Sequence, residues 1–432
     1  MHIDELYKIF IGHPHITTDT RKIEPGSIFF ALKGDKFNGN AFAERAIASG
    51  AAYAVIDEPA FRQDERYLLV ENVLETLQHL AREHRKRLDI PVIGVTGTNG
   101  KTTTKELLKA VLERKYRTFA TAGNLNNHIG VPLSILSIEH NTEMAVIEMG
   151  ANHVGEIEFL CGIARPGYGL ISNVGRAHLE GFGSFEGVKK AKGELYQWLA
   201  GNGGTLFIQQ GNADLMEMAA GKVFKERIGY GLQDDANYRG RLLANDPYLS
   251  LEWTHRDESY QVATHLTGAY NAENLMAAIA VGSYFGVEPE KINAGLGDYV
   301  PSNNRSQIVE TERNTLICDY YNANASSMKA ALENLEAIES HRQKMAIVGD
   351  MFEMGPEAEA EHAKVVLRAK ELVDTECVFV GEEFYRHQAP WAYFFRNTEE
   401  ARLALETKRL EGKLILLKAS RGMTFENLVT VL

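Results

Sequence analysis

Short apolar runs alternate with segments of helical periodicity along most of the chain. From residue 91 onward, runs such as "PVIGV", "EMAVIEMG" and "YGLISNVG" are separated by segments such as "FEGVKKAKGELYQWLA". Strands that alternate with helices in this way predict a parallel sheet joined by crossover helices. The stretch "YLSLEWTHRDESYQVATHL" breaks the alternation. It predicts an antiparallel excursion before the helix "NAENLMAAIAVGSYFG".

Changes in this pattern divide the chain into three predicted domains. Residues 1–82 combine short apolar runs with one helical segment and predict a small α/β domain, followed by the charged, helix-favouring connector "LAREHRKRLD". Residues 83–300 form the central domain with its mostly parallel sheet. A fresh alternation after "YVPSNNRS" predicts a Rossmann-like domain over residues 301–432. A chain of 432 residues agrees with two to three domains. The predicted fold class is therefore α/β in three domains.

Composition limits the classes of function. The net charge of −12 argues against nucleic acid as the main partner, because such surfaces need an excess of Lys and Arg. The three cysteines are far apart and form no C-x-x-C pair, which fits a reducing compartment and indicates neither a disulfide frame nor a zinc site. The chain has no apolar stretch of signal-peptide or membrane-span length. We therefore expect a cytoplasmic protein with no membrane span.

The stretch "PVIGVTGTNGKTTTKELL", residues 91–108, places glycines between a predicted strand and a predicted helix. The standard phosphate-loop template requires a glycine at the position where this chain has Val95. The strand, Gly-Lys-Thr and helix nevertheless coincide, so backbone N–H groups and the helix N-terminus would point at one phosphate. Lys101 would supply a charge, and the Thr102 hydroxyl would reach Mg²⁺. The alternative is a glycine turn with a solvated lysine. The candidate ATP-binding residues of the loop are Gly97, Thr98, Asn99, Gly100, Lys101, Thr102 and Thr103.

Further candidates follow other predicted strands, whose carboxyl ends meet at one edge of a parallel sheet. Glu148 ends "MAVIE" and suits Mg²⁺, although a strand-end glutamate can also be a solvated rim residue. His178 follows "ISNVGRA", but Mg²⁺ prefers oxygen ligands. Lys192 in "AKGEL" could be a solvated lysine; a lysine carbamylated by CO₂ would instead present a carboxylate-like group.

Two more stretches contain polar residues that suit a nucleotide. Asn271 and Asn274 lie one helical turn apart, and their amides suit an adenine edge, although two helix-start asparagines would look the same. Arg305 in "NNRSQ" begins the third domain and could bring a cation to a phosphoryl group, or be a surface arginine.

The loop "TGTNGKTTT" resembles the ATP loop of the Mur ligase family, the amide-bond-forming enzymes of cell-wall synthesis, and of their folylpolyglutamate synthetase relatives. The resemblance extends, in the expected order, through "GNLNNHIGVP", "EMGANHVGEI", "AHLEGFGSFEGVKKAKGEL", "YNAENLMAA", "DYYNANASSM", "GDMFEMG" and "LLKASRGM". The stretches "GNLNNHIG" and "YNANASSM" are the most diagnostic within the family.

The resemblance implies an ATP- and Mg²⁺-dependent ligase of peptidoglycan synthesis, and hence a part in cell shape and division. We expect a monomer, although no sequence feature marks the oligomeric state. It implies that UDP-N-acetylmuramoyl-tripeptide and D-alanyl-D-alanine are the partners, joined through an acyl phosphate. It also implies that Glu148 and His178 help to hold magnesium, and that Lys192 matches a lysine that is carbamylated in several members. The resemblance further implies nucleotide contacts at Asn271, Asn274 and Asp319, the last to ribose. The expected metal ligands are Thr102, Glu148, His178 and, if carbamylated, Lys192; the expected catalytic residues are Lys101, His178, Lys192 and Arg305.

The same resemblance suggests where the two peptide substrates bind. The diphosphate or uracil partners are Thr20, Arg21 and Lys33, whose surrounding turns are otherwise ordinary. Asn126 and Asn127 would face the muramoyl-peptide arm. Ser420 could also be a helix-start cap. The residues expected to orient the dipeptide are Tyr321, Asn322, Asn324, Asp350, Ser420 and Arg421.

Three alternatives stay open at this point. A sibling ligase that adds a single amino acid is disfavoured by "NLNN" and "YNANASSM". A non-catalytic nucleotide-binding pseudoenzyme is disfavoured by the intact Lys101, Thr102, Glu148 and His178. A simple phosphate-loop kinase is disfavoured by the large third domain.

Overall fold

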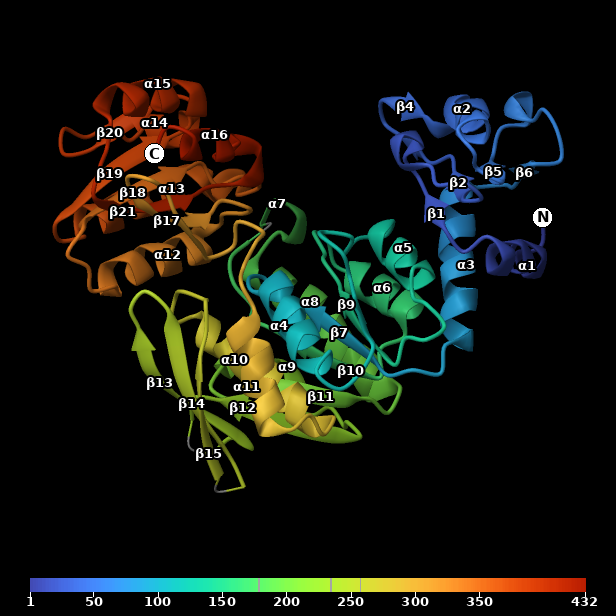
Figure 1. Cartoon of the computed structure of the whole chain (residues 1–432), viewed down its shortest axis with the longest axis horizontal. Helices are drawn as coiled ribbons and strands as arrows, with labels where there is room; N and C mark the ends of the chain where they lie inside the picture. The colour runs from blue at the N-terminus through green and yellow to red at the C-terminus, as the bar shows by residue number, and fades with distance from the viewer. Residues whose placement is uncertain (178, 234, 257) are drawn as a thin grey trace.

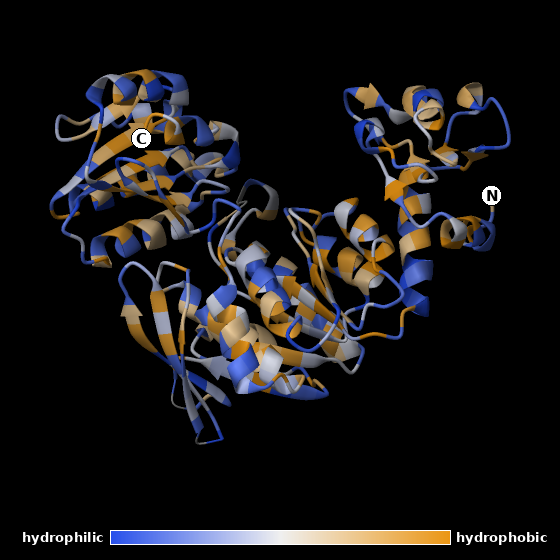
Figure 2. Cartoon of the chain, in the orientation of Figure 1, coloured by the Kyte–Doolittle hydropathy of each residue, from blue (hydrophilic) through white to orange (hydrophobic). Residues whose placement is uncertain are grey.

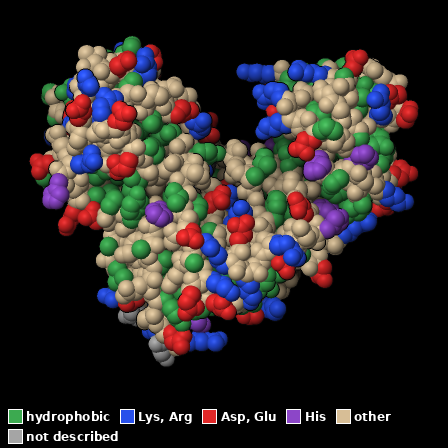
Figure 3. All heavy atoms as spheres, in the orientation of Figure 1, with side chains coloured by type: hydrophobic (Ala, Val, Ile, Leu, Met, Phe, Trp, Pro, Cys, Tyr) green, Lys and Arg blue, Asp and Glu red, His purple; other side chains and the backbone are tan. Residues whose placement is uncertain are grey.

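The structure, a computed structural model, describes residues 1–177, 179–233, 235–256 and 258–432. Its three domains form a V, with the N-terminal and C-terminal domains above the central one (Figure 1). Apolar residues concentrate on the sheets and on the helix faces that cover them (Figure 2). Figure 3 shows the open cleft between the two upper domains, with Lys and Arg side chains gathered on the edge of the N-terminal domain that faces it. The predicted three-domain α/β fold is confirmed.

The N-terminal domain is a four-stranded parallel sheet in the order β1-β2-β5-β6, with a small β3-β4 hairpin beside it. Its long helix α3 packs against the central domain, where Gln78 and Arg85 donate hydrogen bonds to the backbone oxygens of His128 and Ala164. The boundary expected at residue 82 therefore falls inside α3. The elements are α1 (Ile3–Gly12), β1 (Ile16–Thr17), η1 (Thr20–Lys22), β2 (Ile28–Phe30), β3 (Lys33–Gly34), β4 (Phe37–Asn38), η2 (Gly39–Phe42), α2 (Ala43–Ala48), β5 (Tyr53–Ile56), η3 (Pro59–Phe61), β6 (Tyr67–Leu69) and α3 (Val73–Arg87).

The central domain is a nine-stranded sheet in the order β15-β14-β13-β12-β11-β10-β7-β9-β8. Strands β7 to β13 pair in parallel, and β13, β14 and β15 form the antiparallel excursion that the sequence predicts. Its elements are β7 (Val92–Thr96), α4 (Lys101–Leu112), β8 (Thr118–Ala120), α5 (Gly130–Leu136), β9 (Met144–Glu148), α6 (Glu156–Ala164), β10 (Tyr168–Ile171), α7 (Leu179–Phe182), α8 (Phe185–Gly201), β11 (Thr205–Gln209), α9 (Ala213–Ala219), β12 (Glu226–Gly231), β13 (Tyr238–Asn245), β14 (Leu249–His255), β15 (Glu258–Ala263), α10 (Asn271–Tyr284) and α11 (Pro289–Asp298).

The C-terminal domain is a six-stranded sheet in the order β16-β17-β21-β18-β19-β20. All neighbours pair in parallel except β16 with β17, and the last strand of the chain, β21, inserts between β17 and β18. Its elements are β16 (Gln307–Glu310), β17 (Thr315–Asp319), α12 (Ala325–Ala337), β18 (Gln343–Gly349), η4 (Gly355–Glu357), α13 (Ala358–Lys370), β19 (Thr375–Val380), α14 (Glu382–Tyr385), β20 (Tyr393–Phe395), α15 (Thr398–Lys408), β21 (Lys413–Lys418), η5 (Arg421–Met423) and α16 (Glu426–Val429).

Strand register brings the candidate residues of the central domain to one edge. Strand β7 lies between β9 and β10, with Val95 opposite Glu148 and Thr96 opposite Ile171. The loops that follow these three strands therefore leave the sheet at the same level, as expected for the carboxyl ends of parallel strands. Within the residues that the structure covers, no helix is long and apolar enough to cross a membrane.

Candidate active site

The glycine-rich loop lies between the fully buried β7 and the start of α4. Gly97 and Gly100 have φ angles of +145° and +77°, a region that favours glycine. A Cβ on Gly97 would overlap the Ser172 hydroxyl, and one on Gly100 would lie 2.7 Å from the side-chain oxygen of Asn274. The loop is also tied to the segment after β10, because the backbone N–H groups of Thr98 and Asn99 donate to Asn173. The loop is therefore a rigid cradle with room for a ligand but not for side chains.

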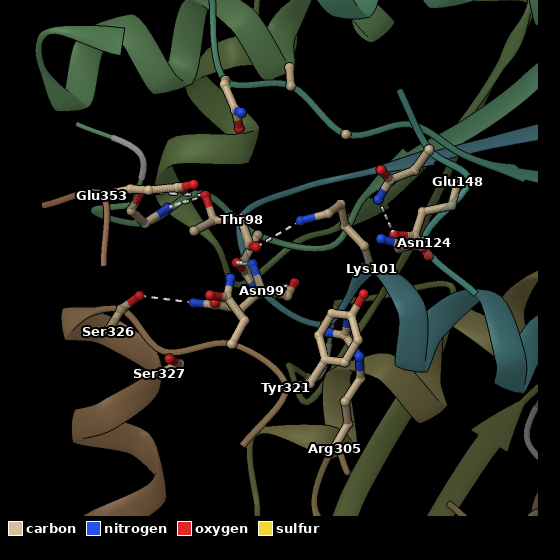
Figure 4. Close-up of a pocket in the computed structure, with 18 of the residues that line it drawn as sticks. Thr98, Asn99, Lys101, Asn124, Glu148, Arg305, Tyr321, Ser326, Ser327 and Glu353 are labelled. Carbon is tan, nitrogen blue, oxygen red and sulfur yellow. Dashed lines mark hydrogen bonds between the residues drawn. The ribbon is translucent and has the colours of Figure 1, made fainter. Parts of the chain in front are cut away.

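Lys101 begins α4 and folds back over the loop. Its Nζ donates to the carbonyl oxygens of Gly97 and Thr98, at 2.8 and 2.9 Å (Figure 4). Burial lowers the pKa of the Lys101 ammonium to about 8; the Glu148 carboxylate opposes the shift and the Arg305 charge adds to it. A cation held by loop carbonyls in a partly desolvated place is suited to meet phosphate oxygens.

Glu148, at the end of β9, offers a ready position for a divalent cation. Its side chain is only 1% exposed. One carboxylate oxygen accepts hydrogen bonds from the Thr102 hydroxyl and the Asn126 amide, at 3.2 and 2.8 Å. The other oxygen, also buried, has no partner among the described residues. A buried carboxylate oxygen without a partner costs free energy unless a cation or water meets it, so Thr102 and Glu148 fit Mg²⁺.

Of the other two expected metal ligands, His178 lies outside the described residues and Lys192 is buried. Lys192, on α8, is 2% exposed, and its Nζ donates to the carbonyl oxygen of Ala151 at 3.2 Å. Burial, and then the charge of Lys101, lower the pKa of Lys192 to about 7. Among the residues with a described placement, no three His, Cys, Asp or Glu side chains gather in a group that could hold a metal ion.

Asn271 and Asn274, on the first turn of α10, hold this helix against α4. Asn274 donates to Asn271 and accepts from the Thr104 hydroxyl, while Asn271 donates to the carbonyl oxygen of Thr267. Both asparagines line the same cavity as the phosphate loop. Their side-chain groups already have protein partners, so their geometry assigns them first to fixing α10 beside Gly100.

The C-terminal domain supplies the opposite wall of the cavity. The Arg305 guanidinium lies 4.0 Å from the ring centre of Tyr321, and both face the phosphate loop (Figure 4). Asp319, at the end of β17, pairs with Lys418 at 2.9 Å and accepts from the backbone N–H of Ser306. Lys418 also donates to the carbonyl oxygen of Asn322, so it anchors the loop after β17.

These walls enclose one cavity of about 1020 Å³ between the central and C-terminal domains. It has room for a nucleotide and further substrate groups, because drug-sized ligand sites typically measure ~300–1,000 Å³. Of the residues expected from the sequence, the following line it: Thr98, Asn99, Gly100, Lys101, Thr103, Asn126, Asn127, Glu148, Asn271, Asn274, Arg305, Asp319, Tyr321, Asn322, Ser420 and Arg421.

Comparison with known proteins assigns the chain to a family. Residues 14–87 match the Mur ligase family catalytic domain, 95–282 the Mur ligase middle domain, and 304–421 the Mur ligase glutamate ligase domain. A UDP-N-acetylmuramoyl-tripeptide–D-alanyl-D-alanine ligase of Bacillus subtilis is 36% identical, with 96% of this chain and 92% of that protein covered.

This chain belongs to the Mur ligase family.

Other relatives agree with that assignment. The Escherichia coli protein of the same name is 34% identical over 96% of this chain and 93% of its own length. A crystal structure of MurF from Acinetobacter baumannii superposes with a TM-score of 0.85 at 30% identity, covering 96% of this chain and 92% of that one. MurF from Thermotoga maritima in complex with ADP gives 0.84 at 26% identity, with 96% of each chain covered. This Mur ligase is therefore an ATP-dependent enzyme that forms amide bonds.

In this Mur ligase, several residues expected to bind the dipeptide also have structural partners. The Asn322 side chain accepts from the backbone N–H of Ala323. Asn324 caps α12, where its side-chain oxygen accepts from the backbone N–H of Ser327 at 3.0 Å. Tyr321 keeps its ring in the cavity under Arg305.

Asp350 is buried and is not among the residues that line the cavity. Its carboxylate accepts from the backbone N–H groups of Glu383 and Phe384 at the start of α14, both at 3.0 Å. Burial raises the pKa of Asp350, and these two N–H groups oppose the shift. The geometry thus gives Asp350 a part in holding β18 against α14.

Ser420 and Arg421, which follow β21, do reach the cavity. Ser420 precedes η5, but its hydroxyl accepts from the backbone N–H of Phe352 at 2.9 Å instead of capping that turn. Arg421 pairs with both carboxylate oxygens of Glu426, at 2.7 and 2.8 Å. A ligand carboxylate would therefore compete with Glu426 for the Arg421 guanidinium.

The residues expected at the UDP end stand apart from this cavity, on the N-terminal domain. Thr20 and Arg21 lie in η1, where Arg21 pairs with Asp19 at 2.8 Å. Lys33 lies between Asp57 and Glu58, at 2.9 Å from each. These cationic side chains already have anionic partners, and diphosphate binding at this place would have to replace them.

Asn126 and Asn127 line the cavity on the central-domain side. Asn126 donates to Glu148, and the Asn127 side-chain oxygen accepts from the backbone N–H groups of Ile129 and Gly130 at the start of α5. Both therefore shape the loop between β8 and α5 beside the cation position.

Three residues that organise the site are not among those expected from the sequence: Asn173, Lys418 and Ser326. Asn173 holds the phosphate loop, and Lys418 holds Asp319. A signal existed for both, because Asn173 follows the strand run "YGLIS" and Lys418 is a charge at the end of the apolar run "KLILLK". Ser326 contacts the loop from another domain, and no sequence pattern indicates that contact.

Proposed function

We propose that this Mur ligase joins D-alanyl-D-alanine to the terminal carboxylate of UDP-N-acetylmuramoyl-tripeptide, with ATP converted to ADP and phosphate, in the cytoplasm. The observation that carries the proposal is the cavity in which the phosphate loop, the Glu148 oxygen that has no partner among the described residues, and the loops after β17 and β21 meet. The similarity over nearly the whole chain to ligases of that name supports the choice of substrates.

The reaction needs activation because a carboxylate has no leaving group that an amine can displace. Transfer of the terminal phosphoryl group to a carboxylate oxygen gives an acyl phosphate. The dipeptide amine, once it has lost a proton, forms a bond to the carbonyl carbon, and the C–O bond to phosphate breaks. The protein contributes mainly alignment and charge neutralisation.

Each part of the site has a place in that scheme. Lys101 and the loop N–H groups hold the phosphates from one side, and Arg305, held over Tyr321, approaches from the other. Magnesium, held by Thr102 and Glu148, would neutralise charge on the phosphate oxygens. Asn126 orients Glu148, and Lys418 keeps Asp319 and the loop after β17 in position.

The test is a matrix of reactions read by product mass. Purified protein and Mg-ATP are combined with the lysine or the diaminopimelate form of the UDP-tripeptide, and with D-alanyl-D-alanine or single amino acids. We expect the mass of the dipeptide adduct, with ADP formed in equal amount only when both peptide substrates are present. A product carrying one amino acid would favour a sibling ligase. Nucleotide binding without any product would favour a pseudoenzyme.

A further inference from the structure

The phosphate loop is hydrogen-bonded to the C-terminal domain through a closed ring of three side chains. The Asn99 amide donates to the Ser326 hydroxyl at 2.9 Å, and that hydroxyl donates to the Asn324 side-chain oxygen at 2.8 Å. The Asn324 amide in turn donates to the Asn99 side-chain oxygen at 2.8 Å. Figure 4 shows Ser326, at the first turn of α12, beside Asn99. The ring thus joins residues 225 and 227 positions apart in the chain.

Each member of the ring is oriented by further contacts. The Asn324 oxygen also accepts from the backbone N–H of Ser327, and the Ser327 hydroxyl accepts from the backbone N–H of Asn324. The backbone of Asn99 is held by Asn173 and Ser172. The ring therefore links two elements that are each fixed in their own domain. Its three hydrogen bonds run in one direction around the ring, so each bond polarises and strengthens the next.

The approach of α12 to the loop depends on a glycine. A Cβ on Gly175 would lie 2.9 Å from the Ser326 hydroxyl and 3.5 Å from a side-chain carbon of Thr98. Any side chain there would crowd Ser326. Gly175 is itself held by Thr98, because its N–H donates to the Thr98 hydroxyl at 3.0 Å. The segment after β10 is thus shaped to admit the N-terminus of α12.

The other end of α12 is also attached to the central domain. Asn334, only 5% exposed, donates to the Thr267 hydroxyl at 3.1 Å and accepts from the Asn245 amide at 2.8 Å. Asn245 and Thr267 border the start of α10, since the Asn245 side-chain oxygen accepts from the backbone N–H of Gly268 and the Thr267 carbonyl oxygen accepts from the Asn271 amide. Helix α12 therefore spans the distance between the phosphate loop and the start of α10, with a polar contact at each end.

We infer that the ring of Asn99, Ser326 and Asn324 is an interdomain latch that sets the C-terminal domain over the phosphate loop. In this position, the domain's Arg305 and Tyr321 face Lys101 across the cavity. The three latch residues are positioning residues: they act on the reaction by fixing where the two walls stand. The inference deepens the proposed function and rests on it only for the expected change in kcat.

Adjacent serines provide a matched pair of variants. Ser326→Ala breaks the ring. Ser327→Ala removes a hydroxyl that bonds the backbone N–H and carbonyl of Asn324, but it removes none of the three ring bonds, and the Asn324 side-chain oxygen keeps its bond to the Ser327 N–H. Asn99→Ala opens the ring from the other domain, so the inference can be tested even where one variant folds poorly. The double variant Asn99→Ala/Ser326→Ala shows whether the two residues act as a unit.

The first readout is the spacing of the two domains in the full chain. Probes are attached at Val223→Cys and Leu367→Cys, which are 82% and 65% exposed, while the three native cysteines are buried. We expect the distribution of probe distances to broaden in Ser326→Ala and in Asn99→Ala, to broaden no further in the double variant, and to be unchanged in Ser327→Ala.

The second readout is kinetic. Breaking the latch should lower kcat on the order of tenfold, because misplacing one wall by a small distance weakens alignment. In Ser326→Ala, the dissociation constant of an ATP analogue should stay within about twofold, because Ser326 lies on the C-terminal domain and its removal takes no group from the phosphate loop. A structural defect in the loop would instead weaken nucleotide binding.

Three results would overturn the inference. They are an unchanged distance distribution in Ser326→Ala, an equal disturbance in Ser327→Ala, and additive effects of Asn99→Ala and Ser326→Ala. A weaker ATP analogue with an unchanged kcat in Asn99→Ala would likewise assign Asn99 to the nucleotide rather than to the latch. If the wild-type protein forms no dipeptide adduct, the proposed function fails, while the distance measurements still decide on the latch.

Discussion

Gly100→Ala should damage the phosphate loop through one identifiable contact. Gly100 has φ +77° at the start of α4, and an added Cβ would lie 2.7 Å from the Asn274 side-chain oxygen and 3.1 Å from its nitrogen. Asn274 has little freedom to move, because it is buried and bonded to Thr104 and Asn271. The methyl group would therefore either push α10 from α4 or distort the loop.

The expected cost has two parts. A non-glycine residue in the left-handed region costs about 1 kcal/mol. Displacing Asn274 loses two hydrogen bonds of about 1 kcal/mol each, within the range of about 1–3 kcal/mol for overpacking. The sum is roughly 3 kcal/mol. Gly123→Ala is the matched control, because Gly123 also has positive φ, +53°, but a Cβ there meets nothing within 4 Å. It should cost only about 1 kcal/mol.

The assay follows urea unfolding of the central domain together with nucleotide affinity. In a Trp391→Phe background, the remaining tryptophans, Trp198 and Trp253, both lie in the central domain and report on it alone. We expect the unfolding free energy of Gly100→Ala to fall about 2 kcal/mol below that of Gly123→Ala, and only Gly100→Ala to lose affinity for an ATP analogue.

Equal unfolding free energies for the two variants would refute the reasoning, because they would mean that the contact with Asn274 adds nothing to the backbone cost. A further check is the double variant Gly100→Ala/Asn274→Ala. If Asn274 is the obstacle, the two changes together should cost less than the sum of the single ones. Strict additivity would place the clash elsewhere.

Three other expectations follow from buried groups. Glu148→Gln should raise the Mg²⁺ concentration that gives half-maximal rate by at least about tenfold, and an unchanged magnesium titration would remove Glu148 from the metal site. Burial lowers the pKa of His84, whose ring contacts Tyr7, so the folded state binds fewer protons than the unfolded state, and stability should fall as pH drops through about 6.5. Urea unfolding should thus show wild type losing stability relative to His84→Gln between about pH 7 and 5, and parallel losses would argue against this. Lys192→Met should raise the midpoint of thermal unfolding most at pH 7 and below, where the folded state carries the unfavourable buried charge. The gain should shrink between pH 7 and 10.5, because burial lowers the pKa of Lys192 from 10.5 to about 7 and the folded state releases this proton first. A lower midpoint at neutral pH would mean that the ammonium has an unseen partner.

The sequence predicts the strands and the phosphate loop well because they depend on local patterns. Apolar runs bounded by glycine, such as "PVIGV" and "MAVIEMG", are buried strands β7 and β9. The glycines of the loop are required by backbone geometry and close approach at those same positions. The antiparallel excursion was equally visible, because its strands interrupt the alternation with helices.

Tertiary partners could not be predicted in the same way. Lys33 is paired with Asp57 and Glu58, which are distant in sequence. The Asp350 carboxylate accepts hydrogen bonds from backbone N–H groups of α14. The pairing of Arg21 with Asp19 can be predicted from the sequence, because Asp19 lies only two residues before Arg21. Asn324 could be placed in a ligand loop, but not in a ring with Asn99, because that contact depends on how two domains sit together.

The central claim is that the phosphate loop transfers a phosphoryl group to the tripeptide carboxylate. It is tested most directly with UDP-N-acetylmuramoyl-tripeptide that carries ¹⁸O in its terminal carboxylate, incubated with Mg-ATP and D-alanyl-D-alanine. The account predicts that the phosphate released carries one ¹⁸O atom for each dipeptide adduct formed, and that Lys101→Met abolishes both together. Dipeptide adduct accompanied by unlabelled phosphate, or formed at an undiminished rate by Lys101→Met, would contradict it.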